Sequence, residues 1–212
     1  MNKKLKKVLL VILIIVVAYL LFTGQLSDVI DIILDAASET PAETTISVLD
    51  DYNGPVLPNE DLSDKDLFDD GIAIVTLDYG IDGDTAAFIV NGKSYHLRML
   101  GIDTPEVDEA LRQLDPWGKA ASSYTKQVLN NAGQIVIQLD PESDTFDKYD
   151  RLLGWVWVDG QLHNYNVVAA GLAEVKYLYG DYLYAGDLKS AEAGAKAQGL
   201  KIWGEKDPDY NY

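Results

Sequence analysis

The chain has 212 residues, of which 48% are hydrophobic, so it can form one packed domain and still carry additional segments. It contains no cysteine and only two histidines. This excludes a disulfide framework, thiol catalysis and cysteine-based zinc sites, and gives little support to a histidine-centred site. The formal net charge of −17 at first argues against a nucleic-acid partner.

The negative charge is unevenly distributed along the chain. Residues 27–70 hold 13 acidic residues and one lysine, whereas residues 71–206 hold 19 acidic and 12 basic residues. The first 26 residues carry four lysines and no acid. Because most of the negative charge lies outside residues 71–206, phosphate recognition there has to come from a local cluster of side chains and a bound cation.

Residues 1–25 begin with lysines and continue with an apolar run from Val8 to Phe22, which predicts a signal-anchor or a signal peptide. The run would span about 22 Å as a helix, less than the ~30 Å hydrocarbon core of a bilayer. Bulky residues follow it where a signal peptidase requires small ones, which favours an uncleaved anchor. We expect an extracytoplasmic protein, held at the cell membrane by this segment, or secreted if the segment is cleaved.

Residues 26–70 separate this segment from the rest of the chain. Apolar residues between Leu26 and Ala37 recur at helical spacing, which predicts a short amphipathic helix. Residues 38–70 are rich in Thr, Glu, Asp and Pro and show no sustained period, which is typical of an extended acidic linker.

Residues 71–206 show the patterns of a folded domain, followed by a polar tail at 207–212. Apolar runs, alternating with polar residues in 94–101, predict strands at 72–75, 85–90, 94–101, 134–139 and 151–158, with Asn91-Gly92 as a hairpin turn. Helical spacing predicts helices at 117–131, 164–170 and 184–198. This order predicts an α+β fold, a five-stranded OB-type β-barrel with about three flanking helices.

Two acidic turns flank the predicted hairpin, and antiparallel strands can bring them side by side. Asp84 and Asp103 are the candidate cation ligands, with the Thr104 carbonyl as a third oxygen and Asp82 placed to orient a bound water. Such oxygen ligands favour Ca²⁺. Either turn alone is more simply explained as an ordinary turn or helix start.

Arg98, Glu106 and Arg151 complete a set that can hydrolyse a phosphodiester. Arg98 lies in an apolar strand and needs an anionic partner there, either a structural carboxylate or a phosphate gripped bidentately. Arg151 is a second candidate, although a solvated surface charge would explain it alone. The arginines and the cation would neutralise charge on phosphorus, while Glu106 takes or orients the proton of the attacking water.

Tyr177 and Tyr179 would point the same way from an extended segment. Packing is the default role for any one of the 13 tyrosines. At a site for single strands, these two could instead stack on a base or bond a phosphate.

Across about residues 71–205 the sequence resembles the staphylococcal nuclease (thermonuclease) family. The resemblance is carried by an ordered set of motifs: Ile81-Asp-Gly-Asp-Thr85, Leu97-Arg-Met-Leu-Gly-Ile-Asp-Thr-Pro-Glu106, Trp117-Gly118, Asp147-Lys-Tyr-Asp-Arg151, Gly171-Leu-Ala173, Tyr177-x-Tyr179 and Ile202-Trp203. Asp150 departs from the pattern, since it stands where a glycine is common.

The resemblance implies Ca²⁺-dependent cleavage of DNA and RNA to 3′-phosphate products. It assigns the calcium ligands to Asp84, Asp103 and Thr104, the general base to Glu106, and phosphate binding to Arg98 and Arg151. It also implies nucleotide contacts for Lys148, Tyr149, Tyr177 and Tyr179.

The leading prediction is therefore a nuclease with DNA or RNA as its substrate and with no protein partner. The alternative is a non-catalytic OB module that binds nucleic acid or protein and is tethered to the membrane. A purely structural surface protein would leave Arg98, Glu106 and Arg151 without a role.

Overall fold

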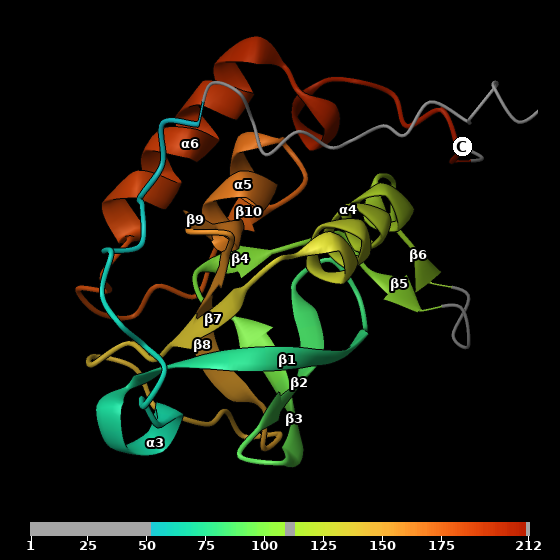
Figure 1. Cartoon of the computed structure of the whole chain (residues 1–212). Helices are drawn as coiled ribbons and strands as arrows, with labels where there is room; N and C mark the ends of the chain where they lie inside the picture. The colour runs from blue at the N-terminus through green and yellow to red at the C-terminus, as the bar shows by residue number, and fades with distance from the viewer. Residues whose placement is uncertain (1–51, 109–112, 211–212) are drawn as a thin grey trace, which may run out of the picture. The chain divides into compact units, whose positions relative to one another are not determined.

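Five strands close on themselves to form a barrel, and three longer helices lie against it (Figure 1). The computed structural model describes residues 52–108 and 113–210. The elements are α3 (Leu67–Asp70), β1 (Ile72–Gly80), β2 (Thr85–Val90), β3 (Lys93–Met99), β4 (Ile102–Asp103), β5 (Val107–Asp108), β6 (Gln113–Leu114), α4 (Gly118–Asn131), β7 (Ile135–Gln138), β8 (Leu152–Val158), β9 (Gln161–Leu162), α5 (His163–Ala169), β10 (Glu174–Val175), α6 (Ala185–Gln198) and the 3₁₀ helix η1 (Lys201–Trp203).

The sheet runs in the order β3-β2-β1-β7-β8-β9, and a parallel pairing of β3 with β8 closes the barrel. Asn91 and Gly92 turn the β2–β3 hairpin with φ angles of 52° and 77°, the left-handed pair that a tight two-residue turn requires. The five-stranded OB-type barrel predicted from the sequence is thereby confirmed, as are the three helices against it.

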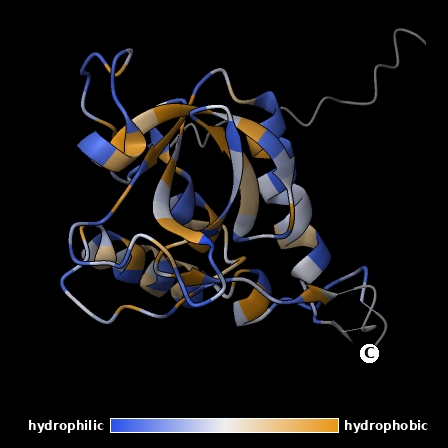
Figure 2. Cartoon of the chain, turned by 90° about the horizontal axis from the view of Figure 1, so that it is seen from below, coloured by the Kyte–Doolittle hydropathy of each residue, from blue (hydrophilic) through white to orange (hydrophobic). Residues whose placement is uncertain are grey.

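The core holds the largest fully buried side chains, among them Phe88, Leu97, Met99, Trp155 and Trp157. The two tryptophan rings lie against Tyr184, which precedes α6, at 5.2 Å between ring centroids. Figure 2 shows hydrophobic residues mainly along the strands and hydrophilic residues along the loops at the rim. The burial of these apolar side chains is the main stabilising contribution to the fold.

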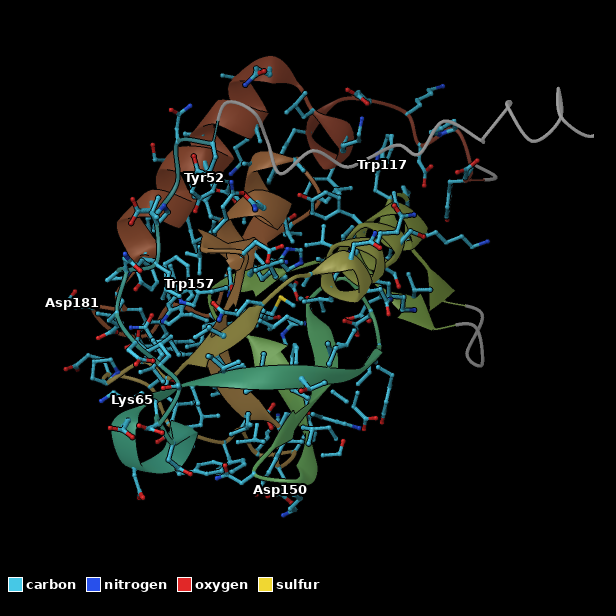
Figure 3. All side chains as sticks on the ribbon, in the orientation of Figure 1. Tyr52, Lys65, Trp117, Asp150, Trp157 and Asp181 are labelled. Carbon is cyan, nitrogen blue, oxygen red and sulfur yellow. The ribbon has the colours of Figure 1, made fainter. Side chains whose placement is uncertain are left out.

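Residues 52–70 differ from the predicted linker, because they pack on the barrel. Tyr52, labelled in Figure 3, anchors the start of this segment. Its hydroxyl accepts a hydrogen bond from the Leu162 N–H at 3.0 Å. Leu62 and Leu67 are buried in the core, and Leu67 begins α3. These apolar residues stand singly among acids, without helical or strand spacing, so pattern analysis does not detect them.

The predicted signal-anchor at 1–25, and the predicted helix and linker up to residue 51, lie outside the described residues. Among residues 52–108 and 113–210, the structure contains no helix that is long and apolar enough to cross a bilayer.

The sequence does not predict two short strands, β4 and β10, which connect distant parts of the chain. β4 pairs with β10 in antiparallel register, so that Asp103 lies opposite Glu174. The pairing brings the segment before α6 against the acidic turn that follows β3.

Candidate active site

The turn between β1 and β2 fixes Asp84 in a buried position. Gly83 permits the close approach of this turn to the chain after β4: a Cβ on Gly83 would lie 2.7 Å from Thr104 Oγ1. Asp84 is 1% exposed, and its Oδ2 accepts hydrogen bonds from the N–H (2.8 Å) and the hydroxyl (3.1 Å) of Thr104. Its Oδ1 accepts one from the Thr85 hydroxyl at 3.0 Å.

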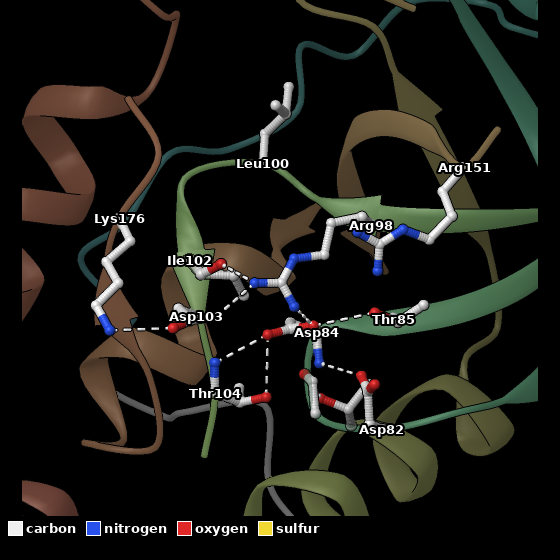
Figure 4. Close-up of polar contacts among 12 residues, drawn as sticks. Asp82, Asp84, Thr85, Arg98, Leu100, Ile102, Asp103, Thr104, Arg151 and Lys176 are labelled. Atoms are coloured by element: carbon white, nitrogen blue, oxygen red, sulfur yellow. Dashed lines mark hydrogen bonds and ion pairs between the residues drawn. The ribbon is translucent and has the colours of Figure 1, made fainter. Parts of the chain in front are cut away.

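Arg98 joins the two acidic turns, as Figure 4 shows. It lies on β3, opposite Thr85 of β2, and its Nη1 donates to Asp84 Oδ1. Its Nη2 donates to Asp103 Oδ1 at 2.7 Å and to the Ile102 carbonyl at 3.0 Å. The guanidinium therefore bridges two carboxylates that lie 19 positions apart in the sequence.

Asp82 completes this group, which we call the Arg98 cluster (Asp82, Asp84, Arg98, Asp103 and Thr104). Its Oδ1 accepts the Asp84 N–H at 3.0 Å, which orients the turn. Burial raises the pKa of Asp82, while the charges of Arg98 and Arg151 and hydrogen bonds from Thr85 act against that rise.

Lys176 adds a second cation to Asp103. Its Nζ lies 3.1 Å from Asp103 Oδ2 and 3.0 Å from a Glu174 oxygen. Hydrogen bonds to Glu174 and Asp103 raise the pKa of Lys176, so it is charged at neutral pH. Sequence analysis did not single out this lysine, because only the β4–β10 pairing brings it to Asp103.

Arg151 enters the same region from the loop before β8. Its Nε donates to Asp147 Oδ2 at 2.8 Å, and its own N–H donates to Asp147 Oδ1 at 2.9 Å. Burial acts to raise the pKa of Asp147, but hydrogen bonds from Arg151 and Tyr149 lower it overall. Figure 4 shows the Arg151 side chain beside that of Arg98, and its charge acts to lower the pKa of Asp82, so the two arginines predicted to bind phosphate lie in one region.

Each of these arginines lies near an exposed tyrosine ring. Arg98 Cζ is 5.9 Å from the centroid of Tyr177, and Arg151 Cζ is 5.5 Å from that of Tyr149. Lys148 Nζ is 4.9 Å from the Tyr149 centroid, and Tyr179 is next to Tyr177 at 6.5 Å between rings. Of the four residues predicted to contact nucleotides, Tyr149 and Tyr177 thus each lie beside an arginine. Lys148 lies beside the Tyr149 ring, and Tyr179 lies next to the Tyr177 ring.

Glu106 is exposed and lies on the rim of the site. It lines a groove of about 460 Å³ together with Asp103, Thr104, Asp115 and Lys176. Its backbone is held by Asp115: the Glu106 N–H donates to Asp115 Oδ2 at 3.3 Å, and the Asp115 N–H donates to the Glu106 carbonyl at 3.0 Å. This leaves a carboxylate beside the groove, next to the Arg98 cluster.

The donor set suits a hard cation. Asp84 and Asp103 supply carboxylate oxygens, the type of ligand that Ca²⁺ prefers. In this structure both carboxylates form ion pairs with the guanidinium of Arg98. In the part of the chain that the structure describes, three or more His, Cys, Asp or Glu side chains are nowhere gathered as a complete ligand set.

A buried histidine, His163, contacts the Thr125 side chain that holds the Asp82–Asp84 turn. The Thr125 hydroxyl donates to the Gly83 carbonyl at 2.7 Å and lies 3.0 Å from His163 Nε2. His163 is fully buried and stacks on Tyr124 at 5.8 Å, and burial lowers its pKa to about 4. Its position in the sequence gives no sign of this role, because 38 residues separate it from Thr125.

Comparison with known proteins agrees with this geometry. The model of the family described as "Staphylococcal nuclease homologue" matches residues 96–205. Endonuclease YncB of Bacillus subtilis (strain 168) is 39% identical over 130 residues, which are 61% of this chain and 61% of that protein. The SPbeta prophage-derived endonuclease YokF of the same strain is 38% identical over 130 residues, 61% of this chain and 43% of the relative.

A thermonuclease of Staphylococcus hyicus is 34% identical over 123 residues, which cover 58% of this chain and 71% of that protein. The chain therefore spans less than two thirds of the length of the two Bacillus relatives and more than two thirds of this one. The family match itself starts at residue 96, but the structure joins Asp82 and Asp84 to the matched region through Arg98. Because the family model covers more than half of the chain, and the fold and the Arg98 cluster agree with it, this chain belongs to the staphylococcal nuclease family.

Proposed function

We propose that the chain is an extracytoplasmic, Ca²⁺-dependent nuclease that hydrolyses DNA or RNA and leaves 3′-phosphate ends. The observation that carries the proposal is the bridge of Arg98 between Asp84 and Asp103, with Arg151 beside it and Glu106 on the adjoining groove. The printed names of the relatives, two endonucleases and a thermonuclease, support the same reaction.

In this proposal Asp84, Asp103 and the Thr104 carbonyl would hold the calcium ion. When bound, the ion supplies positive charge beside the phosphate and shares with Arg98 the role of partner to the two carboxylates. Asp82 accepts a hydrogen bond from the Asp84 N–H, which stabilises the conformation of the turn and thus the orientation of the Asp84 carboxylate.

The protein's own residues account for the remaining chemistry. Glu106 takes a proton from the attacking water, an oxygen–phosphorus bond forms, and the bond from phosphorus to the 5′-oxygen breaks. The 5′-oxygen leaves as a hydroxyl after taking a proton from solvent water. Arg98 and Arg151 stabilise the charge that develops on the phosphate oxygens. The exposed rings of Tyr149 and Tyr177 beside these arginines offer contacts to the nucleotide.

The location at the membrane remains part of the proposal. It rests on the lysine-flanked apolar run in residues 1–25, which would hold the domain at the outer side of the membrane if it is not cleaved and direct its secretion if it is. Fractionation of cells that produce the full chain, followed by protease treatment of intact cells, tests it. Retention in the cytoplasm would contradict it.

The decisive experiment incubates the full chain with single-stranded DNA, first with calcium and then with a chelator, and analyses the ends produced. We expect cleavage with calcium only, and 3′-phosphate ends. Glu106→Gln removes the carboxylate at the rim and should lower kcat by at least about 100-fold. The matched control, Glu60→Gln, changes an exposed glutamate elsewhere and should leave the rate unchanged.

A non-catalytic binding module is the second candidate. It is favoured by the pairing of both arginines with carboxylates, Arg98 with Asp84 and Asp103, and Arg151 with Asp147. Binding of the DNA without cleavage under any calcium concentration would select this candidate over the nuclease.

A further inference from the structure

A second groove, of about 580 Å³, adjoins Arg151. It lies along the first residues of β3, next to the turn of the β2–β3 hairpin. Figure 3 shows Asp150 at this end of the barrel. The groove is lined by Lys93, Ser94, Tyr95, His96, Phe146, Tyr149, Asp150 and Arg151. We call it the hairpin groove.

Aromatic rings gather along the hairpin groove and remain partly exposed. Tyr149 is 66% and Phe146 is 39% exposed. The Phe146 ring lies 6.3 Å from that of Tyr95 and 6.3 Å from that of Phe68, with which it is nearly parallel at 16°. Phe68, on α3, is itself 40% exposed, so the group presents ring surface to solvent instead of ending in the core.

The charge of the hairpin groove differs from that of the chain as a whole. Its lining carries two permanent cations, Lys93 and Arg151, against the carboxylate of Asp150 and that of Asp147, which pairs with Arg151, whereas the whole chain has a net charge of −17. Lys93 Nζ lies 4.5 Å from the centroid of the Tyr95 ring, so a cation and an aromatic face occupy the same place. Cations alternating with aromatic rings suit a chain of phosphates and bases.

The groove is continuous with the candidate active site, because Arg151 and Tyr149 belong to both. Tyr95 and Arg98 stand three residues apart on β3, about 10 Å, but on opposite faces of the strand, so the two sites are connected through Arg151 and Tyr149, which line the groove with Tyr95. A polynucleotide with one phosphate at the two arginines can therefore reach Tyr95 and Phe146 within its neighbouring nucleotides.

We propose that the hairpin groove is a subsite for single-stranded nucleic acid, in which unpaired bases stack on Phe146 and Tyr95 while Lys93 contacts the backbone. The inference rests on the proposed nuclease function and adds a substrate class to it. A duplex hides the faces of its bases, so it cannot use the rings in this way. Single-stranded substrates should bind more tightly than duplexes, and longer strands more tightly than short ones.

The competing explanation is that the rings only fasten α3 and the loop before β8 to the barrel. Replacing Phe146 by leucine distinguishes the two, because leucine keeps apolar contact with Phe68 and Tyr95 but has no aromatic face. Phe146→Tyr keeps the face. Urea unfolding of each variant shows whether packing has been disturbed.

The test measures, by isothermal titration with a chelator present, the binding of oligothymidylates of two and about eight nucleotides to the full chain. We expect the longer strand to bind at least about 5-fold more tightly than the dinucleotide. Phe146→Leu and Lys93→Ala should remove most of that gain without weakening dinucleotide binding, and Phe146→Tyr should keep it. Lys189→Ala, at an exposed lysine of α6, is the matched charge control and should keep it too.

Three results would overturn the subsite: equal binding of both lengths, full binding by Phe146→Leu, or a duplex of the same length bound as tightly as the single strand. A cleavage assay on the same preparations separates this proposal from the proposed function. Cleavage without any length-dependent gain leaves the nuclease standing and removes the subsite, whereas absence of both cleavage and binding removes the two together.

Discussion

Lys176 and Asp103 form an ion pair, with 3.1 Å between Nζ and Oδ2, at a carboxylate whose other oxygen is held by Arg98. Asp103 therefore faces two cations of the protein itself. A calcium ion that uses Asp103 has to compete with both, so the protein's own positive charge should set its calcium affinity.

We predict that Lys176→Ala tightens calcium binding by about 2- to 5-fold, because it removes a competing charge from a partly exposed ion pair. Calorimetric titration of the full chain with calcium measures this directly. Lys176→Arg keeps the charge and should bind calcium as the unaltered protein does. Weaker binding by Lys176→Ala would show that Lys176 holds Asp103 in place for the ion.

Arg98→Ala is expected to lose cleavage and also to lower stability. Asp84 is 1% exposed, and the variant would leave its carboxylate without the guanidinium that neutralises it. Removing one partner of a buried ion pair costs about 3–5 kcal/mol of unfolding free energy. Urea unfolding in a chelator should show this loss.

Calcium should restore more stability to Arg98→Ala than to the unaltered chain, because the ion can replace the missing positive charge. Lys189→Ala, again, is the control for loss of an exposed cation. An Arg98→Ala variant as stable as the unaltered chain in the chelator would mean that Asp84 does not depend on Arg98. Glu106→Gln is the cleaner test of catalysis, since Glu106 is exposed.

His163 should make stability depend on pH in a defined window. Its pKa is about 4 in the folded chain, against about 6.5 for an unperturbed histidine. Above pH 6.5 both states are neutral, and as the pH falls from 6.5 to 4 only the unfolded state takes up the proton. The fold therefore loses about 3 kcal/mol over this window, and nothing further from this group below it.

His163→Gln removes the titrating group while keeping a polar side chain near Thr125. Its unfolding free energy should fall less steeply between pH 6.5 and 4 than that of the unaltered chain, by up to about 1.4 kcal/mol per pH unit. His96→Gln, at the exposed histidine, is the control. Identical slopes for His163→Gln and the unaltered chain would contradict the assignment.

The sequence predicts the barrel because its strands are short apolar runs, alternating in β3, and because its main turn is Asn91-Gly92. The two acidic turns and Arg98 are likewise predictable, since a hairpin must return the chain to its starting edge. Lys176 and His163 are not, because they reach the site through pairings between distant segments, the β4–β10 ladder and the contact of α5 with α4. Local patterns carry no signal for such contacts.

The same distinction applies to residues 52–70. Their acids and prolines predict a linker, while the burial of Leu62 and Leu67 depends on a surface that only the folded barrel provides. Composition describes the average character of a segment, and a few apolar anchors can override it.

Asp150 combines a left-handed backbone conformation with a negative charge beside Arg151. It has a φ angle of 59°, in the left-handed region that favours glycine, and it directly precedes Arg151. This explains why a glycine is common at this place in the family pattern, and aspartate is one of the few other residues that tolerate the conformation. Its carboxylate also lines the hairpin groove beside Arg151.

Asp150→Gly should raise the unfolding free energy by up to about 1 kcal/mol, because it relieves the left-handed strain. It should also lower KM for single-stranded DNA, since it removes a negative charge from the phosphate's path. Asp150→Asn removes the charge but keeps the tolerance for this backbone, so it should lower KM without changing stability. The gain in both variants should shrink as salt rises, because exposed charges are screened. A lower KM in Asp150→Gly alone would assign the effect to the backbone of the loop that carries Arg151.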